Sequence, residues 1–264
     1  MKNIVFSVIA SAVRSHFYEE FYNCLNEDNK IPFEIVFAGD SPPKKVMPDN
    51  FRYIETGVKP IQCFEITARH SVGEYILMIG DDFLFNKEFL NKMYSHIERN
   101  KNEKVIIAPR YNKGSKKIKC VDEAVPSKDD NPVFFNKKIK GSPLIGITAA
   151  LRRDLWHEYG GYDNRFLGVF ADCDMRMRFL EKGYKVVTAL DCCCFERYRK
   201  ANPSRDNSNL ISRSGERKAQ NILDMLWITK KGKISKNRLL PVESFKDKDI
   251  LVKSQGEVEK SLWV

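Results

Sequence analysis

The sequence predicts an α/β fold with a mostly parallel sheet flanked by helices. Short runs rich in β-branched and aromatic residues alternate with segments of helical period, which is the order of elements in such folds. The runs are almost continuously apolar, as in strands that helices cover on both faces. The chain has 264 residues, a length that suits one domain with an extension.

The expected strands are short and bounded by turn residues. They cover residues 4–9, 33–38, 75–79, 104–108 and 185–189. A first helix is predicted after Ser15, a suitable N-cap, because Phe17, Phe21 and Leu25 share one helical face. The same period predicts a helix over residues 89–97. A further helix runs from about Asp172 to Gly183, a C-cap residue, and residues 219–227 are compatible with another.

Cysteine and apolar patterns indicate a cytoplasmic protein. The seven cysteines include three in a row, residues 192–194, and no C-x-x-C pair. No zinc spacing accompanies the four histidines, which are His16, His70, His96 and His157. Residues 4–12 resemble a short signal peptide, but a buried first strand explains the same run. No apolar run approaches the ~20 residues that cross a bilayer.

The charge balance favours anionic partners. Lys and Arg outnumber Asp and Glu by 45 to 35, for a net charge of +10, which suits nucleic acid, an anionic membrane surface or phosphorylated substrates. The basic residues are densest at 113–119, 137–140 and 230–236. No nucleic-acid-binding motif is present, and no G-x-G-x-x-G follows the first strand. We therefore expect no nucleic acid partner, and we keep peripheral contact of the basic tail with a membrane as an open alternative.

Two pairs of aspartates that are close in sequence are candidates for chemistry, and the first is Asp81-Asp82. Asp81 and Asp82 follow a predicted strand, where ligands bind in α/β folds. A divalent cation would relieve their repulsion, since Mg²⁺ takes one or two protein carboxylates together with substrate phosphates. The alternative is a turn and helix cap, a common role of Asp.

Asp172 and Asp174 lie at the start of a predicted helix. Capping explains one of them, but two carboxylates at this spacing cannot both cap the helix, so the other is free to face a cleft. Arg176 and Arg178 follow on the same helix and could pair with carboxylates or phosphates.

Four segments together resemble family 2 glycosyltransferases, which have the GT-A fold. They are "FEIVFAGDSPP", "ARHSVGEYILMIGDDF", "AALRRDLWHEYGGYD" and "ADCDMRMRFLEKGYKVV", and their order covers residues 3–195. The resemblance implies a GT-A type, Rossmann-like sheet in a single domain. Residues 1–100 would form its sugar-nucleotide-binding half, residues 101–200 its acceptor and catalytic half, and residues 201–264 a C-terminal extension.

The resemblance implies a role for each matching residue. The donor-binding residues would be Ala10, Ser11, Asp40, Arg69 and Asp81. Asp82 would coordinate Mn²⁺ or Mg²⁺, with Glu196 in place of the histidine that the family often has there. Asp172 would be the general base, and Trp156 would form part of the acceptor floor unless it only packs an apolar helix face. Arg213, Arg217 and Lys218 are further candidates to offset the charge of the leaving diphosphate.

The activity implied is that of an inverting, hexosyltransferase-like enzyme of polysaccharide biosynthesis. It would transfer a sugar from a nucleoside diphosphate to a hydroxyl of a glycan, and UDP is the nucleoside diphosphate we expect. The chain departs from the family pattern at Gly39, Gly80, His70 and Ala171. The alternative is therefore a degenerate GT-A protein that binds a glycan or a nucleotide without chemistry.

Overall fold

The computed structural model describes residues 3–112, 133–135, 143–145, 149–166, 168, 170–197, 213–231 and 235–247. Its strands are β1 (Phe6–Ser11), β2 (Phe33–Gly39), β3 (Phe51–Glu55), β4 (Tyr75–Met78), β5 (Phe83–Phe85), β6 (Val105–Asn112), β7 (Val133–Phe135), β8 (Pro143–Ile145), β9 (Ala149–Arg152) and β10 (Lys185–Glu196). Its helices are η1 (Ser15–Phe17), α1 (Tyr18–Asn26), α2 (Pro60–His70), α3 (Phe89–Arg99), α4 (Arg153–Glu158), α5 (Ala171–Glu181) and α6 (Arg213–Trp227).

Eight strands form one mixed sheet in the order β3-β2-β1-β4-β9-β6-β10-β5, and β7 and β8 form a separate pair. Strands β3, β2, β1 and β4 are parallel, as are β6 and β10. Strand β9 runs antiparallel to β4 and β6, and β5 runs antiparallel to β10. We call the edge where β2, β1 and β4 end the carboxyl edge. It lies next to the loops that carry Asp40 and Asp81-Asp82.

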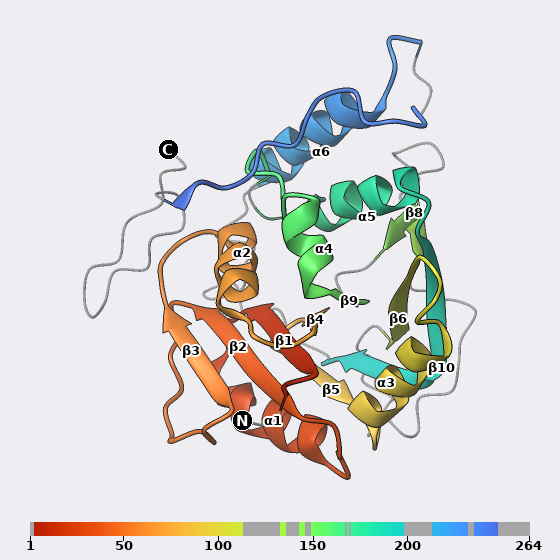
Figure 1. Ribbon diagram of the computed structural model, residues 1–264. Coiled ribbons are helices and arrows are strands. Elements are labelled where there is room, and N and C mark those ends of the chain that lie inside the picture. Colours follow the sequence, from red (N-terminus) through yellow and green to blue (C-terminus); the bar gives the residue numbers. More distant parts are fainter. Residues whose placement is uncertain are drawn as a thin grey trace.

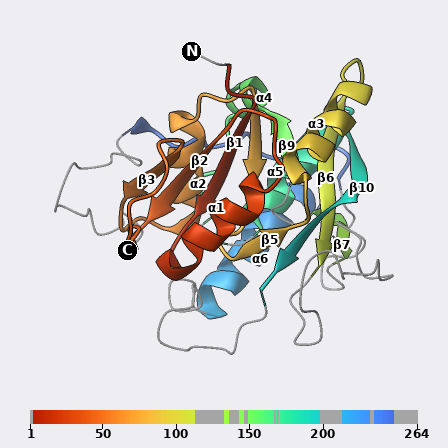
Figure 2. The ribbon, with the colours of Figure 1, turned by 90° about the horizontal axis from the view of Figure 1, so that it is seen from below.

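Helices cover both faces of the sheet, which confirms the predicted α/β architecture (Figure 1). On one face, α1 and α3 pack through Phe21 and Met93 onto the strands. On the other face, α2, α4, α5 and α6 enclose a second core that includes Trp156 and Trp227. Figure 2, seen from below, shows α1 and α3 in front of the sheet. The near-continuous apolar strands are therefore buried from both sides, as their composition predicts.

Two local features differ from the sequence expectation. Ser15 is not the N-cap of α1, because a turn of 3₁₀ helix begins at Ser15 and α1 follows it. Strand β3 and helix α2 were not anticipated. Strand β3 is short and carries Arg52 near its start. Helix α2 begins at Pro60 after Lys59, whose backbone N–H donates to Gln62 Oε1 at 3.1 Å.

The described part of the C-terminal extension packs onto the domain. The indole N–H of Trp227, at the end of α6, donates to Asp174 Oδ1 of α5 at 2.9 Å. Beyond α6, Arg238 Nε donates to the same oxygen at 2.9 Å, and its Nη2 donates to Asp163 Oδ2 at 2.6 Å. Phe245 is buried in the core beside α2. This segment therefore stabilises the helices that bear the candidate site.

We call Asp163, Asp174, Arg178 and Arg238 the carboxylate network. Both carboxylates are fully buried, and Arg178 Nε donates to Asp174 Oδ2 at 3.0 Å. Burial alone would raise the pKa of Asp163, but hydrogen bonds from Arg165 and Arg238 outweigh it and lower the pKa to about 2. Both carboxylates have cationic hydrogen-bond donors, so removing one cation leaves their buried negative charge less compensated.

Replacing Arg238 by Met tests the network. Because the change leaves Asp163 and Asp174 without a shared cation, we expect the free energy of unfolding to fall by about 3–5 kcal/mol. Urea denaturation at pH 7.5 measures it. The matched control is Arg152→Met, since Arg152 is exposed and pairs with exposed Asp154, an arrangement that contributes about 0–1 kcal/mol. Equal effects of the two substitutions would contradict a stabilising role of the network.

Candidate active site

Asp81 ties the loop after β1 to the end of β4. Its Oδ2 accepts hydrogen bonds from the backbone N–H groups of Val13, at 2.7 Å, and Arg14, at 2.9 Å. The Arg14 guanidinium pairs with Oδ1. Burial raises the pKa of Asp81, while Arg14 and the two backbone donors act against that rise. Asp81 therefore holds the loop after β1 in place at the carboxyl edge. Both of its carboxylate oxygens already accept hydrogen bonds from donors of this chain.

Asp82 lies next to the end of another strand. Its Oδ1 is 3.9 Å from Arg14 Nη1, and the side chain is buried. Strand β10 pairs with β5 so that Glu196 lies opposite Phe83, and the backbone N–H of Arg197 donates to the Asp82 carbonyl at 3.1 Å. The pairing brings Asp82 and Glu196 to neighbouring strand ends. Carboxylate oxygens are the ligands that Mg²⁺ and Mn²⁺ prefer, so both side chains have the chemistry that a hard divalent cation would need.

Close approach of neighbouring atoms explains two departures from the family pattern. A Cβ at Gly80 would lie 2.8 Å from Asp82 Oδ1 and 2.9 Å from the Phe83 ring. A Cβ at Gly39 would lie 2.0 Å from the backbone oxygen of Ala12. An acidic residue at either position would displace the carboxyl edge. Glycine at positions 39 and 80 therefore allows the backbone to pack closely against its neighbours.

The ends of β1 and β2 form a polar region beside Asp81. Ala10 is buried in β1, Ser11 is nearly buried, and the Ser11 side chain hydrogen-bonds with Cys63. Asp40 is exposed just beyond β2 and accepts a hydrogen bond from Ser41 Oγ at 3.1 Å. Burial raises the pKa of Tyr18, and the charges of Asp81 and Asp40 raise it further. Asp40 and Asp81 therefore act on the same tyrosine at the carboxyl edge.

The structure does not bring Arg69 to this region. Arg69 lies near the end of α2, where its guanidinium donates to Glu65 Oε1 at 2.9 Å and to the Phe245 carbonyl at 2.6 Å. The next residue, His70, accepts a hydrogen bond from Arg52 at the start of β3. Since β3 runs toward the carboxyl edge, the end of α2 lies at the opposite edge of the sheet. Arg69 therefore connects α2 to the C-terminal segment.

Trp156 is also placed away from solvent. The side chain is fully buried, and its indole N–H donates to Glu65 Oε2 at 3.0 Å. Its ring packs edge-on against Tyr162, with centroids 4.9 Å apart. In this arrangement Trp156 packs α4 against α2, the apolar alternative that the sequence left open.

Asp172 lies in the first turn of α5. The helix begins directly after Phe170, whose backbone is in the left-handed region at φ 67°. It lines a small cavity of about 20 Å³ together with Met78, the last residue of β4, and Arg176. Burial raises the pKa of Asp172 to about 6, although backbone N–H donors act against the rise. Because Met78 shortly precedes Asp81-Asp82, Asp172 adjoins the same strand end. A partly exposed carboxyl with this pKa is suited to accept a proton near neutral pH.

The two arginines of α5 differ in their partners. Arg178 belongs to the carboxylate network and also donates to the Gly161 carbonyl at 2.6 Å. Arg176 is 9% exposed, and its Nε and Nη1 make no hydrogen bond with any residue that the structure describes. Burial lowers the pKa of Arg176 to about 10. The sequence named both as possible partners of anions, and only the fold separates the structural arginine from the one beside Asp172.

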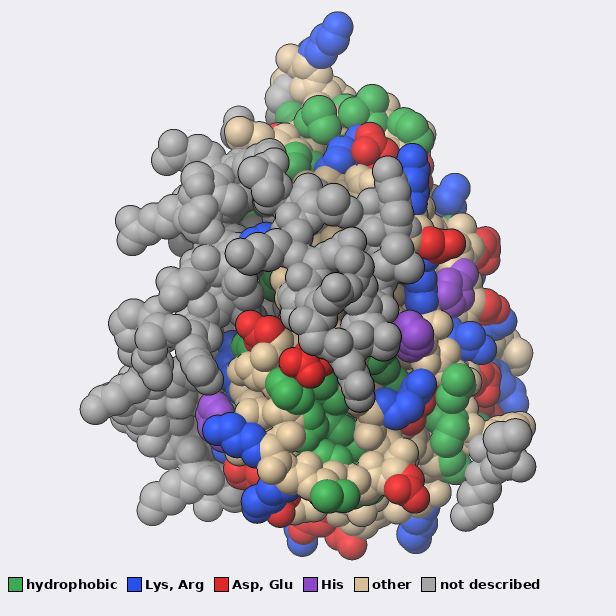
Figure 3. Space-filling view, turned by 90° about the vertical axis from the view of Figure 1, so that its left-hand side faces the viewer, with side chains coloured by type: hydrophobic (Ala, Val, Ile, Leu, Met, Phe, Trp, Pro, Cys, Tyr) green, Lys and Arg blue, Asp and Glu red, His purple; other side chains and the backbone are tan. Residues whose placement is uncertain are grey.

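Several sequence candidates lie outside the described residues. These include the basic stretches 113–119 and 137–140 and part of 230–236, together with the side chains of Arg213, Arg217 and Lys218. On the face seen in Figure 3, basic and acidic side chains are interspersed over the described surface. None of the described helices has the length and apolar character needed to cross a bilayer.

Solved glycosyltransferase structures share this fold. The structure of S. aureus TarS 1–349 superposes with a TM-score of 0.53 at 17% identity, over 73% of this chain and 60% of that one. TarS 1–349 in complex with UDP-GlcNAc gives a TM-score of 0.52 at 17% identity, over 76% and 61% of the two chains. The mannosyltransferase PcManGT from Pyrobaculum calidifontis, in complex with GDP-Man and Mn²⁺, gives 0.53 at 15% identity, over 76% and 59%.

These likenesses confirm the predicted GT-A type fold. The chain spans about 60% of the length of these proteins, and the low identity assigns no family within the fold. No protein-family profile matches the sequence, and no curated protein matches it.

The raised pKa of Asp172 predicts a pH-dependent effect of Asp172→Asn on stability. An Asp in the unfolded chain has a pKa near 4, so the folded protein, with a value of about 6, binds this proton more tightly. Ionisation of Asp172 therefore costs stability as the pH rises from about 4 to 6. We expect Asp172→Asn to be roughly 1–3 kcal/mol more stable than wild type at pH 8, with the gain lost at pH 4. Urea denaturation at both pH values measures the difference, and a gain that does not change with pH would contradict the raised pKa.

Proposed function

We propose that this protein is an inverting glycosyltransferase, which transfers a sugar from a nucleoside diphosphate, most simply UDP, to a hydroxyl group of a glycan. The observation that carries the proposal is the position of Asp172. A carboxyl whose pKa is raised to about 6 lines a cavity with Met78, at the strand end that leads to Asp82. Structures of similar fold were solved with UDP-GlcNAc and with GDP-Man, which supports a sugar nucleotide as the donor.

The donor would bind along the carboxyl edge. Exposed Asp40 and the Ser11 hydroxyl are polar groups suited to the ribose or base of a nucleotide. The loop after β1, held by Asp81, would lie beside the diphosphate. Ligands bind at this edge in open α/β sheets because the loops between strands and helices meet there.

Asp82 and Glu196 would hold Mn²⁺ or Mg²⁺, and the bound cation would supply Lewis-acid stabilisation of the departing diphosphate. The neighbouring PcManGT was solved with Mn²⁺. In this chain the backbone pairing holds Glu196 opposite Phe83, the residue that follows Asp82. The Arg14 guanidinium, which pairs with Asp81 and lies near Asp82, partly compensates the negative charge of these two adjacent carboxylates.

Asp172 would act on the acceptor. The acceptor hydroxyl oxygen attacks the anomeric carbon from the face opposite the diphosphate, and its proton passes to Asp172. The bond between the anomeric carbon and the diphosphate oxygen breaks with its electrons on that oxygen, so the configuration inverts. A positioned general base contributes about 10²–10⁴-fold, and the carboxylate network fixes α5 and hence the position of Asp172.

Asp172→Asn separates binding from chemistry. The variant keeps Asp82 and the β1 loop, so UDP with Mn²⁺ should raise its melting temperature as in wild type. Transfer should fall by about 10²–10⁴-fold. A screen of sugar nucleotides with several glycan acceptors, read as nucleotide release, identifies the donor and measures the loss.

The matched control is Asp154→Asn. Asp154 also lies in the first turn of a helix, α4, and its side chain is 57% exposed and pairs with Arg152. Its substitution should leave transfer unchanged. Normal transfer by Asp172→Asn would remove Asp172 as the base. Nucleotide binding by the wild type without release from any donor would instead support the binding-module alternative.

Arg176 gives an independent test of the same site. We expect its guanidinium to bind an anionic group of a substrate, because no described hydrogen bond satisfies its Nε and Nη1. Arg176→Met should stabilise the unliganded protein by about 1–4 kcal/mol, as replacement of a buried charge often does. It should also raise a substrate KM with little change in kcat. Loss of stability with unchanged KM would show that Arg176 is a structural cation.

A further inference from the structure

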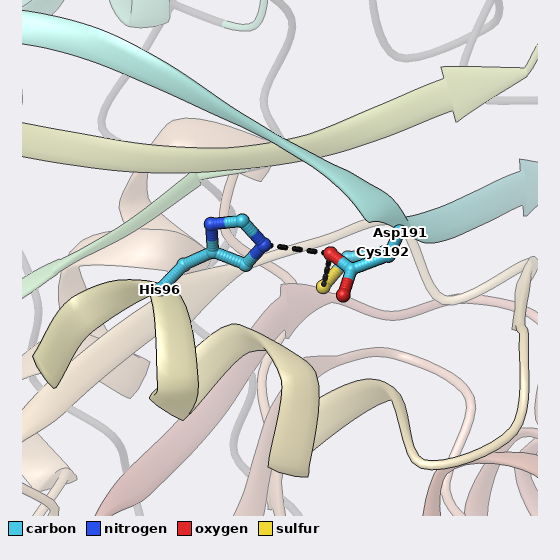
Figure 4. Close-up of side chains that lie close together, drawn as sticks. All are labelled: His96, Asp191 and Cys192. Atoms are coloured by element: carbon cyan, nitrogen blue, oxygen red, sulfur yellow. Dashed lines mark hydrogen bonds and ion pairs between the residues drawn. The ribbon is translucent and has the colours of Figure 1, made fainter. Parts of the chain in front are cut away.

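Three side chains with metal-binding atoms lie together where α3 packs against β10 (Figure 4). His96 comes from α3, and Asp191 and Cys192 come from β10. Their ligand atoms all lie within 4.8 Å of one another. His96 Nε2 is 2.6 Å from Asp191 Oδ1, and Cys192 Sγ is 3.8 Å from the same oxygen. We call these residues the His–Asp–Cys cluster.

An irregularity of β10 makes the cluster possible. Adjacent side chains of a regular strand point to opposite faces of the sheet, so Asp191 and Cys192 would normally diverge. The register of β10 against β6 shifts between Ala189 and Cys193, and both side chains approach His96 (Figure 4). Such bulges re-aim side chains.

Asn86 fixes the backbone of this bulge. Its Nδ2 donates to the Asp191 carbonyl at 2.8 Å, and its Oδ1 accepts a hydrogen bond from the Cys193 backbone N–H at 2.9 Å. The bulged segment is therefore held on both sides of Cys192. This arrangement positions two of the three metal-binding groups in advance of any ion.

The donor atoms favour zinc over the hard cations of the carboxyl edge. The cluster offers an imidazole nitrogen, a sulfur and a carboxylate oxygen, and each of these is a ligand type that zinc takes in proteins. The thiolate and the carboxylate would balance the two positive charges of the ion. Cys192 is fully buried, whereas the Asp191 side chain is 54% exposed, which leaves a side open for a water ligand.

We propose that the His–Asp–Cys cluster is a zinc site that joins α3 to β10. Binding replaces the hydrogen bond between His96 and Asp191 with bonds from both side chains to the ion. The Cys192 thiol loses its proton to solvent and binds as the thiolate. The site uses neither Asp82 nor Glu196, the two residues proposed to hold the cation at the carboxyl edge. The proposal goes beyond the transferase activity and does not depend on it.

Zinc content after gel filtration tests the proposal. Protein stripped with a chelator and incubated with Zn²⁺ should retain one ion per chain, and Zn²⁺ should raise its melting temperature. Co²⁺ in place of Zn²⁺ should produce a thiolate-to-cobalt charge-transfer band. His96→Gln and Cys192→Ser should lose the ion, the stabilisation and the band. His96 is near the surface, so the His96→Gln variant remains informative if Cys192→Ser does not fold.

Three controls identify the site. His157→Gln changes an exposed histidine of α4, and Cys193→Ser changes the neighbouring cysteine, which packs with Phe195; both should retain zinc. Asp82→Asn should also retain it. Zinc lost in Asp82→Asn would place the ion at the carboxyl edge and overturn the proposal. Zinc retained in both His96→Gln and Cys192→Ser, or not retained by wild type, would overturn it as well.

Discussion

The carboxylate network constrains the rest of this structure. Asp174 lies one turn inside α5 and accepts hydrogen bonds from Arg178, from Trp227 of α6 and from Arg238 of the C-terminal segment. A helix held from three directions cannot rotate without breaking buried ionic hydrogen bonds. Asp172, two residues earlier on the same helix, is therefore presented to the end of β4 in a fixed orientation. The C-terminal segment thus contributes to the candidate active site without contributing a reacting group.

Each pair of neighbouring carboxylates divides into a structural and a chemical member. Asp81 is occupied by Arg14 and two backbone N–H groups, while Asp82 lies beside Glu196 at the strand ends. Asp174 is occupied by the network, while Asp172 borders a cavity. In both pairs the occupied carboxylate fixes the backbone that positions its neighbour.

The sequence predicted the α/β architecture because long apolar strands and amphipathic helices each leave a strong local pattern. It also placed Asp40, Asp82 and Asp172 at strand or helix ends, which local patterns reveal. It did not reveal that Arg69 and Trp156 meet Glu65 away from the carboxyl edge, since those contacts depend on how α2 and α4 pack. The cluster of His96 with Asp191 was also hidden. The two residues are distant in the chain, and no sequence pattern predicts the bulge that brings both Asp191 and Cys192 near His96.

A crystal structure with UDP and Mn²⁺ would show whether the carboxyl edge binds a sugar nucleotide between Asp82 and Asp172. We expect Mn²⁺ in direct contact with Asp82, the diphosphate beside the loop of Val13 and Arg14, and the nucleoside near Asp40 and Ser11. The Asp172 carboxylate should face the space that the transferred sugar would occupy. Nucleotide bound at the opposite edge of the sheet, or Mn²⁺ without contact to Asp82, would contradict sugar-nucleotide binding at the carboxyl edge.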